Sequence, residues 1–269
     1  MTITRASKNL IKDIRALRLK KRRDETGTYL AEGISVVLRA LEAGAPVLSL
    51  IYSPELLRSE AAYQAIASAA GRLPCLEADP DLFASISNRD NPTGMAAVIA
   101  YHDLQPRDIV VGSDSVYVAL DAIKSPGNLG TILRTADGLG FAGVILIGEA
   151  TDQYHPECVK ASMGTVFSVP VTRFPSTAEF LGWCSDRGLS LITTSCRARD
   201  DVTTIAAYPR PAALLMGAEA TGLEGDTLQV GRLQVRIPMH GTASSLNLAV
   251  ATAILMYDII SKPAQQPLD

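Results

Sequence analysis

Short apolar runs alternate with amphipathic stretches along most of the chain. In the N-terminal part this pattern predicts helices over 34–42, 59–69 and 81–86 and strands over 47–52, 74–76 and 95–100. Further along it predicts strands over 116–120, 144–147, 189–193, 213–216 and 234–237, with helices over 129–138, 177–187 and 246–260. Short buried strands that alternate with helices are typical of an α/β fold whose largely parallel sheet is covered on both faces.

A basic amphipathic helix is predicted near the start of the chain, over 5–20. Its polar face carries four cations, which are Arg5, Lys8, Lys12 and Arg15. Its opposite face carries the apolar side chains Leu10, Ile14 and Leu17, which we expect to dock on the folded body. Residues 20–23 (Lys-Lys-Arg-Arg) extend the positive charge, and residues 26–28 (Thr-Gly-Thr) end the helix.

The pattern divides the chain into two predicted domains. A polar stretch with Pro106 and Gly112 separates two series of helices and strands. We therefore expect a small N-terminal α/β domain over 1–103, a linker over 104–114 and a larger domain over 115–269. A chain of 269 residues is long enough for two such domains.

Composition adds one asymmetry to this picture. Hydrophobic content of 47% with 20% charged residues describes a soluble globular protein. Residues 1–27 hold nine Lys and Arg against three Asp and Glu, a net charge of +6. The net charge of the whole chain is −3, so residues 28–269 carry a net charge of −9. A basic arm on an acidic body indicates a polyanionic partner at that end, although a solvated helix face explains the same charges.

The cysteine and histidine pattern argues against a metal site. The four cysteines lie far apart without a Cys-x-x-Cys pair, and the chain has only three histidines. Neither a metal cluster nor a disulfide framework is expected, and free thiols fit a reducing compartment such as the cytoplasm. No signal peptide is expected, because charged residues interrupt the apolar positions of 11–19. No membrane span is expected either, because 246–260 is shorter than the roughly 20 residues of a transmembrane helix. That apolar stretch is predicted to be a buried or interface helix.

One nucleotide-binding pattern is misleading. Residues 138–143 satisfy Gly-x-Gly-x-x-Gly, the fingerprint of dinucleotide-binding loops. That fingerprint requires a strand before it and a helix after it, so that phosphate meets the helix N-terminus. Here a predicted helix precedes the glycines and a predicted strand follows. We interpret them as a helix C-cap and a tight turn.

Three segments join a predicted strand to a polar loop, and strand ends are where α/β domains usually hold their sites. They cover 121–136, 216–223 and 237–247. In the first, Asn128 caps a helix and Arg134 is a surface charge, or both belong to a site. In the second, Glu219 positions a hydroxyl or an Arg, or it occupies a helix N-terminus. In the third, a serine is the expected N-cap of the last helix, whereas Asn247 needs a partner.

Taken together, these segments resemble the SpoU (TrmH-type) branch of the SPOUT superfamily, S-adenosylmethionine-dependent RNA 2′-O-methyltransferases. The resemblance lies in Pro126-x-Asn128-x-Gly130-x-x-x-Arg134-Thr-Ala, in Gly217-x-Glu219-x-x-Gly222-Leu223 and in Ile237-Pro-Met-x-Gly-x-x-Ser-Ser245-Leu-Asn247. Ala249 departs mildly, since the family often has Ser there. Residues 22–33 and the basic helix before them resemble the family's ribosomal-protein-like substrate-binding domain.

The resemblance implies a fold, a cofactor and a set of site residues. The C-terminal domain would contain a deep trefoil knot, a rare exception to the rule against threaded chains. S-adenosyl-L-methionine would contact Gly217, Ile237, Met239 and Leu246. The catalytic set would be Arg134, Asn128, Glu219, Ser245 and Asn247, without a metal. The RNA-binding set on the basic arm would be Lys8, Lys12, Arg15, Arg22 and Arg23.

The resemblance further implies a homodimer that methylates a ribose 2′-hydroxyl. The attached N-terminal domain favours ribosomal RNA over transfer RNA. A tRNA 2′-O-methyltransferase, a non-catalytic RNA-binding relative and a methyltransferase for small molecules or proteins are the alternatives. A non-catalytic relative would not need Arg134, Glu219 and Asn247, and a small-molecule or protein enzyme would not need the basic arm.

Overall fold

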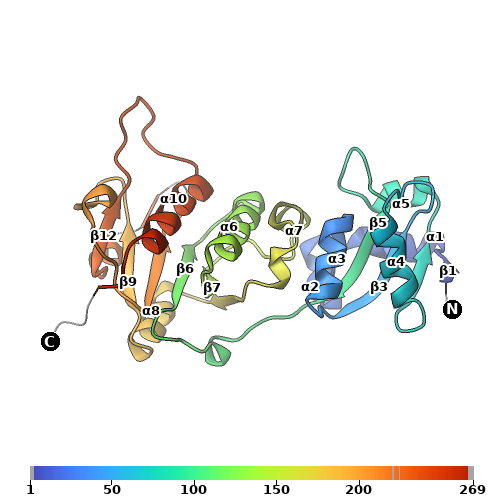
Figure 1. The fold of residues 1–269 in the computed structure, drawn as a ribbon, viewed down its shortest axis with the longest axis horizontal. Coiled ribbons are helices and arrows are strands. Elements are labelled where there is room, and N and C mark those ends of the chain that lie inside the picture. Colours follow the sequence, from blue (N-terminus) through green and yellow to red (C-terminus); the bar gives the residue numbers. More distant parts are fainter. Residues whose placement is uncertain (1–2, 220, 224, 266–269) are drawn as a thin grey trace. The chain divides into compact units, whose positions relative to one another are not determined.

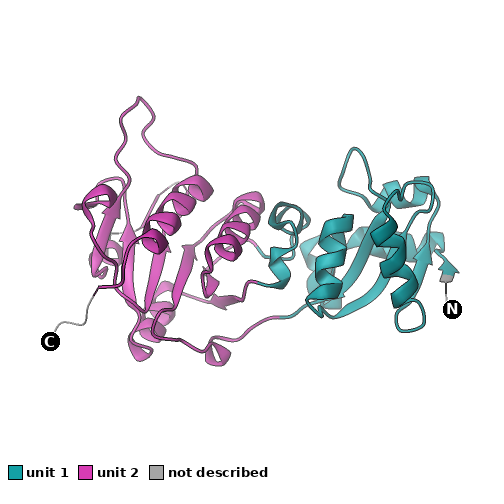
Figure 2. Cartoon of the chain, in the orientation of Figure 1, with its two compact units in different colours: residues 1–102, 152–168 teal, residues 103–151, 169–269 magenta. Residues whose placement is uncertain are grey.

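The computed structural model describes residues 3–219, 221–223 and 225–265. The chain divides into two compact units (Figure 2). Unit 1 holds the residues up to His102 together with 152–168, and unit 2 holds 103–151 and the residues from Val169 onward. The boundaries predicted from the sequence for the substrate-binding domain (1–103), the linker (104–114) and the methyltransferase domain (115–269) stay a prediction.

Unit 1 is built on a mixed five-stranded sheet. Its strands are β1 (Ile3–Arg5), β2 (Thr28–Glu32), β3 (Val47–Tyr52), β4 (Cys75–Glu77) and β5 (Met95–Ala100). Their order is β1-β4-β3-β5-β2, in which β4 runs parallel to both β1 and β3 and β5 runs antiparallel to both β3 and β2. The predicted strands β3, β4 and β5 are confirmed. The two edge strands β1 and β2 were not predicted.

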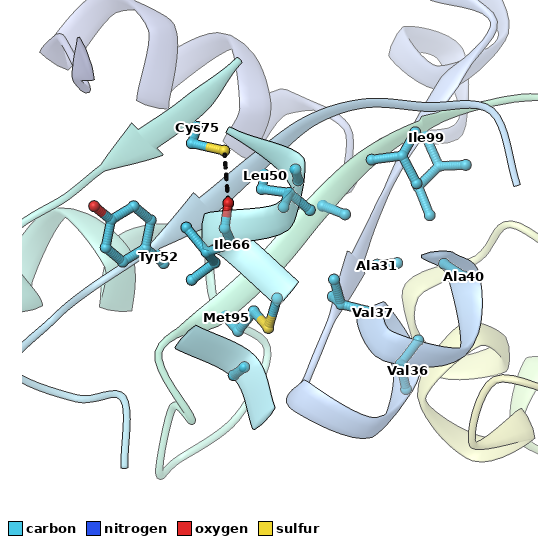
Figure 3. Close-up of a cluster of buried hydrophobic side chains, with 14 of the residues drawn as sticks. Ala31, Val36, Val37, Ala40, Leu50, Tyr52, Ile66, Cys75, Met95 and Ile99 are labelled. Atoms are coloured by element: carbon cyan, nitrogen blue, oxygen red, sulfur yellow. Dashed lines mark hydrogen bonds between the residues drawn. The ribbon is translucent and has the colours of Figure 1, made fainter. Parts of the chain in front are cut away.

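Helices cover both faces of this sheet. They are α1 (Lys8–Ala16), α2 (Lys20–Thr26), α3 (Ile34–Glu42), α4 (Glu60–Ala69) and α5 (Pro80–Ile86). Helices α3 and α4 bury apolar side chains with β3 and β5 in the cluster of Figure 3, where the Cys75 thiol lies 3.9 Å from the Ile66 carbonyl oxygen. Helices α1 and α5 supply the core on the other face. Unit 1 is therefore a three-layer α/β/α domain.

The predicted helix over 5–20 is wrong in its bounds and in part of its apolar face. Helix α1 begins at Lys8, because the hydroxyl of Ser7 caps it by accepting from the Leu10 amide at 3.3 Å. Helix α1 ends at Ala16, and a second helix, α2, begins at Lys20. Leu10 is 38% exposed, whereas Ile11 is buried at 3%. The docking face thus contains Ile14 and Leu17 as predicted, and Ile11 takes the place of Leu10.

Residues 152–168 lie in unit 1, although they follow strand β7 of unit 2. They form α7 (Pro156–Ser162) and a short 3-10 helix η2 (Thr165–Phe167), neither of which was predicted. Helix α7 packs on the edge strand β2. Tyr154 stacks on Tyr101 with ring centroids 4.1 Å apart and planes 11° apart. The burial of Tyr154 and Val159 in the core of unit 1 makes this segment part of that unit.

Unit 2 is built on a parallel sheet of seven strands. They are β6 (Val116–Asp121), β7 (Gly143–Ile147), β8 (Val171–Phe174), β9 (Ser190–Thr194), β10 (Asp200–Asp201), β11 (Ala212–Met216) and β12 (Leu233–Arg236). Their order is β10-β12-β9-β11-β6-β7-β8. The five predicted strands are confirmed within about a residue at each end, a normal boundary error. Strand β11 lies between β6 and β9, although it follows both in the chain.

Helices cover this sheet too. They are α6 (Pro126–Leu139), α8 (Thr177–Asp186), α9 (Gly225–Gln229) and α10 (Leu248–Ser261). The 3-10 helices η1 (Pro106–Asp108) and η3 (Val202–Thr204) lie in the connections. Helix α8 packs Phe180 and Cys184 on one face of β6, β7 and β11. Helices α6 and α10 lie side by side (Figure 1). The interpretation of residues 138–143 is confirmed, since Gly140 is the left-handed C-cap of α6 and β7 follows.

Helix α10 is apolar on its buried and its exposed sides. It buries Ala249, Leu255, Met256 and Ile259. It also exposes apolar side chains, namely Val250 (49%), Ile254 (40%), Tyr257 (65%) and Ile260 (37%). Within the described part of the chain, no helix is both long enough and apolar enough to cross a bilayer.

Candidate functional site

The three polar segments leave the same edge of the unit 2 sheet. Strands β6, β11 and β12 run parallel in one sheet, so their carboxyl ends point the same way. The loop after β6 leads into α6, the loop after β11 includes 217–219 and 221–223, and the loop after β12 covers 237–247. In open α/β sheets, this carboxyl edge is where ligands bind.

The first turn of α6 sets the position of Asn128. The Ser125 hydroxyl caps the helix by accepting from the Asn128 amide at 3.3 Å, and Pro126 occupies the first helical position. Ser125 is therefore the cap, and the alternative in which Asn128 caps this helix is wrong. Just before it, Ala122 has a φ of 49°, a strained value for a residue with a Cβ. The cap leaves the Asn128 side chain free to make contacts outside α6.

Asn247 caps the last helix. Its Oδ1 accepts from the backbone amides of Ala249 at 2.9 Å and Val250 at 3.3 Å. The serine cap that we expected here is wrong, since α10 begins at Leu248 and Ser245 lies in the loop before it. The expectation that Asn247 needs a partner is confirmed.

Asn128, Glu219 and Asn247 form one hydrogen-bond chain. Asn247 Nδ2 donates to Asn128 Oδ1 at 3.2 Å, and Asn128 Nδ2 donates to Glu219 Oε1. Because the helix amides require the oxygen of Asn247, its NH₂ group must face Asn128. Asn128 must then turn its own NH₂ group toward Glu219, so the cap fixes both amide orientations. The structure thus brings together three residues that lie far apart in the sequence.

The loop after β11 folds tightly on itself. The Gly222 amide donates to the Ala218 carbonyl at 2.9 Å, and Gly222 adopts a left-handed φ of 70°. A Cβ on Gly217 would lie 2.2 Å from the carbonyl carbon of Gly222, so no other residue fits there without moving the backbone. This close approach brings the backbone of Gly217 against that of Gly222 and Leu223.

The loop after β12 offers unpaired backbone groups. Among the described residues, 237–246 make no backbone-to-backbone hydrogen bond. Ile237, Met239 and Leu246 in this loop are half-buried. Apolar side chains together with free amides and carbonyls suit a flat ligand that is recognised mainly through the backbone. The donor set of the two loops therefore fits the adenosine and amino-acid parts of S-adenosylmethionine.

Arg134 and Ser245 do not belong to the hydrogen-bond chain. Arg134 is exposed on α6, and its guanidinium has no hydrogen bond or ion pair to any other described residue. Ser245 is likewise exposed. The Arg134 guanidinium is thus free to meet a substrate, and all its N–H donors are available.

Asp201, on strand β10 beside β12, is a charged residue near this edge that the sequence did not single out. Its carboxylate accepts from the Thr203 amide at 3.0 Å and from the Thr203 hydroxyl at 2.8 Å. The Thr203 bonds, followed by Arg236 and His240, hold the pKa of Asp201 below its usual range. In the sequence this aspartate sits in a polar connection with no motif to mark it. Among the described residues, no group of three His, Cys, Asp or Glu side chains could hold a metal.

The structure separates the expected RNA-binding cations of unit 1. Lys8, Lys12 and Arg15 are exposed on one face of α1. Arg22 pairs with Glu25 on the same helix at 3.3 Å, which offsets part of its charge. Arg23 is different, and its assignment to RNA binding is wrong.

Arg23 is fully buried and joins three segments of unit 1 through hydrogen bonds. Its guanidinium donates to the carbonyls of Leu17 at 3.1 Å and Arg18 at 2.9 Å, and to Asp152 Oδ2 at 3.0 Å. The ion pair with Asp152 ties α2 to the residues that precede α7. A run of four cations looks uniform in the sequence, and only the packing shows that one of them points inward.

Comparison with known proteins agrees with this geometry. Residues 115–257 match the SpoU rRNA Methylase family, and residues 8–97 match the MRM3-like substrate binding domain. The chain is 32% identical to a 23S rRNA (uridine(2479)-2′-O)-methyltransferase of Streptomyces viridochromogenes, over 90% of this chain and 85% of that protein. It is 29% identical to the 23S rRNA (guanosine(2553)-2′-O)-methyltransferase RlmP of Bacillus subtilis, over 96% and 98%.

Solved structures show the same similarity. An AdoMet-bound rRNA methyltransferase from Sinorhizobium meliloti superposes with a TM-score of 0.85 at 37% identity, covering 96% of this chain and 97% of that one. The family match spans more than half of the chain and includes all three polar segments. The chain therefore belongs to the SpoU family of rRNA methylases.

Proposed function

We propose that the protein transfers a methyl group from S-adenosyl-L-methionine to a ribose 2′-hydroxyl of ribosomal RNA. The observation that carries this proposal is the chain of Asn128, Glu219 and Asn247 at the carboxyl edge of the unit 2 sheet. It supplies fixed polar groups beside loops that fit the cofactor. The names of the relatives, which are 23S rRNA 2′-O-methyltransferases, support the same reaction.

The cofactor supplies the electrophilic methyl carbon, and the residues of this chain hold and orient what reacts with it. We assign Gly217, Ile237, Met239 and Leu246 to cofactor binding. Gly217 is needed for its lack of a Cβ, and the other three belong to the loop with unpaired backbone groups. The AdoMet-bound relatives from Sinorhizobium meliloti and Streptomyces viridochromogenes support S-adenosyl-L-methionine as the cofactor.

Arg134 is assigned to the nucleophile. The 2′-hydroxyl loses its proton as it attacks, so negative charge develops on the oxygen. A guanidinium stays protonated and is a poor base, but it stabilises a developing alkoxide or an adjacent phosphate by charge-assisted hydrogen bonds. Arg134 is suited to this because it is exposed and has no other partner among the described residues.

The hydrogen-bond chain is assigned to substrate geometry. Glu219 is exposed and its second carboxylate oxygen remains available to accept from a ribose hydroxyl. Asn128 holds the carboxylate, and Asn247 holds Asn128 from the start of α10. Ser245, exposed in the loop before α10, is assigned as a further hydroxyl contact to the substrate. Such preorganisation keeps the acceptor oxygen in line with the methyl group.

RNA binding is assigned to the exposed face of α1, through Lys8, Lys12 and Arg15, with a smaller contribution from Arg22. Their spacing presents positive charge along one side of the helix. Contacts of this kind weaken steeply with salt, because phosphate neutralisation releases counterions. Arg23 takes no part, since it is buried.

Three further features belong to the proposal. A homodimer is supported by the apolar face of α10, where Val250, Ile254 and Tyr257 recur at helical spacing and are exposed. A deep trefoil knot is supported by the chain path, which places β11 between β6 and β9 and then brings α10 back to α6. A cytoplasmic location remains a prediction from the free cysteines.

Methyl transfer to purified RNA tests the proposed function. The protein is incubated with methyl-labelled S-adenosylmethionine and either a full-length 23S rRNA transcript or total tRNA. We expect label in the 23S rRNA. Label in tRNA alone would support the tRNA enzyme instead. Cofactor binding without label in either RNA would indicate a non-catalytic relative.

A further inference from the structure

Unit 1 contains a small cavity whose lining includes no residue of α1. It is lined by Leu30, Glu32, Asn88, Arg89, Pro156 and Lys160. These residues come from the edge strand β2, from the loop after α5 and from α7, and all belong to unit 1. We call this cavity the Glu32 pocket. None of its residues takes part in the proposed reaction.

Glu32 fastens the loop after α5. One oxygen of its carboxylate accepts from the Ser87 hydroxyl, and the other accepts from the Asn88 amide at 2.8 Å. Ser87 in turn accepts from the Arg89 amide at 3.0 Å. The Glu32 side chain is only 10% exposed. A nearly buried carboxylate that gathers hydroxyl and amide donors holds this loop in one conformation.

The same carboxylate fixes the side chain of Arg89. The Arg89 Nε lies 4.0 Å from Glu32 Oε1, and one terminal nitrogen donates to the Glu32 carbonyl at 3.4 Å. Gly33 makes room for this, because a Cβ there would lie 2.8 Å from that terminal nitrogen. Gly33 also has a φ of 115°, which other residues rarely adopt. The guanidinium is thus held from one side and keeps further N–H donors for a ligand.

Lys160 supplies a second cation from α7. It is exposed, and its ammonium has no ion pair or hydrogen bond within the described residues. The ionisable groups that line the pocket are Glu32, Arg89 and Lys160, which together carry one net positive charge. Both Glu32 oxygens already accept hydrogen bonds inside the protein, and the charged donors of the pocket are those of Arg89 and Lys160.

We propose that Arg89 and Lys160, two cations that line the Glu32 pocket and are open to solvent, bind a phosphodiester group of the RNA substrate, with Glu32 as the positioning residue. The inference rests on the proposed function and deepens it, since it names a second RNA contact in unit 1. A preorganised guanidinium beside a flexible ammonium matches the several oxygens of a phosphate. This contact would hold the RNA at a point separate from the cations of α1.

Binding to a 23S rRNA transcript across a salt series tests the pocket. The variants are Arg89→Gln and Lys160→Gln, with Arg58→Gln, an exposed arginine elsewhere in unit 1, as the matched control. Loss of one phosphate contact should weaken binding several-fold and lower the salt slope by about 1. Cofactor affinity and the melting temperature should not change. If both variants bind with the affinity and salt slope of the control, the proposal is overturned.

Glu32→Ala separates positioning from simple charge. Removing a negative charge should strengthen RNA binding if the pocket acts only through its field. If Glu32 positions Arg89, binding should weaken and the salt slope should fall as in Arg89→Gln. The double variant, Glu32→Ala with Arg89→Gln, should then bind RNA no more weakly than either single variant.

The outcomes distinguish the pocket from the proposed function. If the wild-type protein methylates 23S rRNA and the pocket variants bind this RNA with wild-type affinity, only the proposal for the pocket is refuted. A wild-type protein that neither binds nor methylates this RNA refutes the proposed function with it.

Discussion

Asn247 Nδ2 donates to Asn128 Oδ1 at 3.2 Å, and this bond joins the start of α10 to the first turn of α6. The same Asn247 side chain caps α10 through its oxygen. One residue thereby links the stability of a helix to the orientation of the Asn128 amide. Because Asn128 also donates to Glu219, Asn247 indirectly fixes the position of the Glu219 carboxylate in the loop after β11.

Two substitutions at Asn247 separate these roles. Asn247→Ala removes the cap and should destabilise the fold by about 1 kcal/mol. Asn247→Asp keeps an oxygen for the helix amides but loses the NH₂ group that Asn128 requires. We expect near wild-type thermal stability for Asn247→Asp together with strongly reduced methyl transfer. Full activity of Asn247→Asp would show that the bond to Asn128 has no role in the reaction.

Arg134 should matter for the reaction and not for the fold. Arg134→Ala removes a guanidinium that has no partner within the described residues, so the melting temperature should hold. Loss of charge stabilisation at the nucleophile should lower kcat by about 10² to 10³. Arg134→Lys keeps the positive charge but loses the planar guanidinium, so its kcat should lie between those of the wild-type protein and Arg134→Ala. Single-turnover methyl transfer checks this, and undiminished rates in both variants would contradict the role given to Arg134.

Substitution of Arg23 should affect mainly stability, and substitution of Arg22 mainly RNA binding. Arg23→Ala leaves Asp152 buried without its partner, so we expect a loss of about 3 kcal/mol in the free energy of unfolding. Arg22→Ala removes an exposed pair with Glu25 and should cost less than about 1 kcal/mol while weakening RNA binding. Chemical denaturation and RNA titration measure the two effects. Equal stability of both variants would argue against the buried ion pair.

The cysteines should differ in reactivity. Cys75, Cys158 and Cys184 are buried, whereas Cys196 is exposed. Burial raises the pKa of Cys184 to about 12, which keeps it in the unreactive thiol form at neutral pH. A thiol-specific reagent should therefore label Cys196 first in the native protein and all four cysteines after denaturation. Rapid native labelling of Cys184 would contradict the packing of α8.

Much of the core could be predicted from the sequence, because its elements carry strong periodic signals. The strands β3, β5, β6 and β11 are largely apolar runs, and their observed bounds agree closely with the predicted ones. The edge strand β2 escaped prediction because its outer residues, Thr28 and Glu32, are polar. Helix α7 escaped because its burial depends on contact with β2, a non-local fact that no pattern within 156–162 records.

The three residues of the hydrogen-bond chain could be named from the sequence, but their contacts with one another could not. Asn128, Glu219 and Asn247 were selected from dispersed motifs, and their mutual hydrogen bonds depend on the order of the strands in the sheet. The caps were misassigned because Ser125 and Asn247 compete with nearby residues of equal capping ability. Arg23 looked like its neighbours because charge in the sequence does not show which way a side chain points.

The position of the transferred methyl group tests the central claim most directly. Labelled 23S rRNA from the methyl-transfer reaction is digested with alkali, which cleaves next to every ribose that has a free 2′-hydroxyl. The account predicts that the label is recovered in one alkali-resistant dinucleotide, and that Arg134→Ala removes it. Label recovered on the base of a mononucleotide, or no label in 23S rRNA, would contradict ribose 2′-O-methylation by this protein.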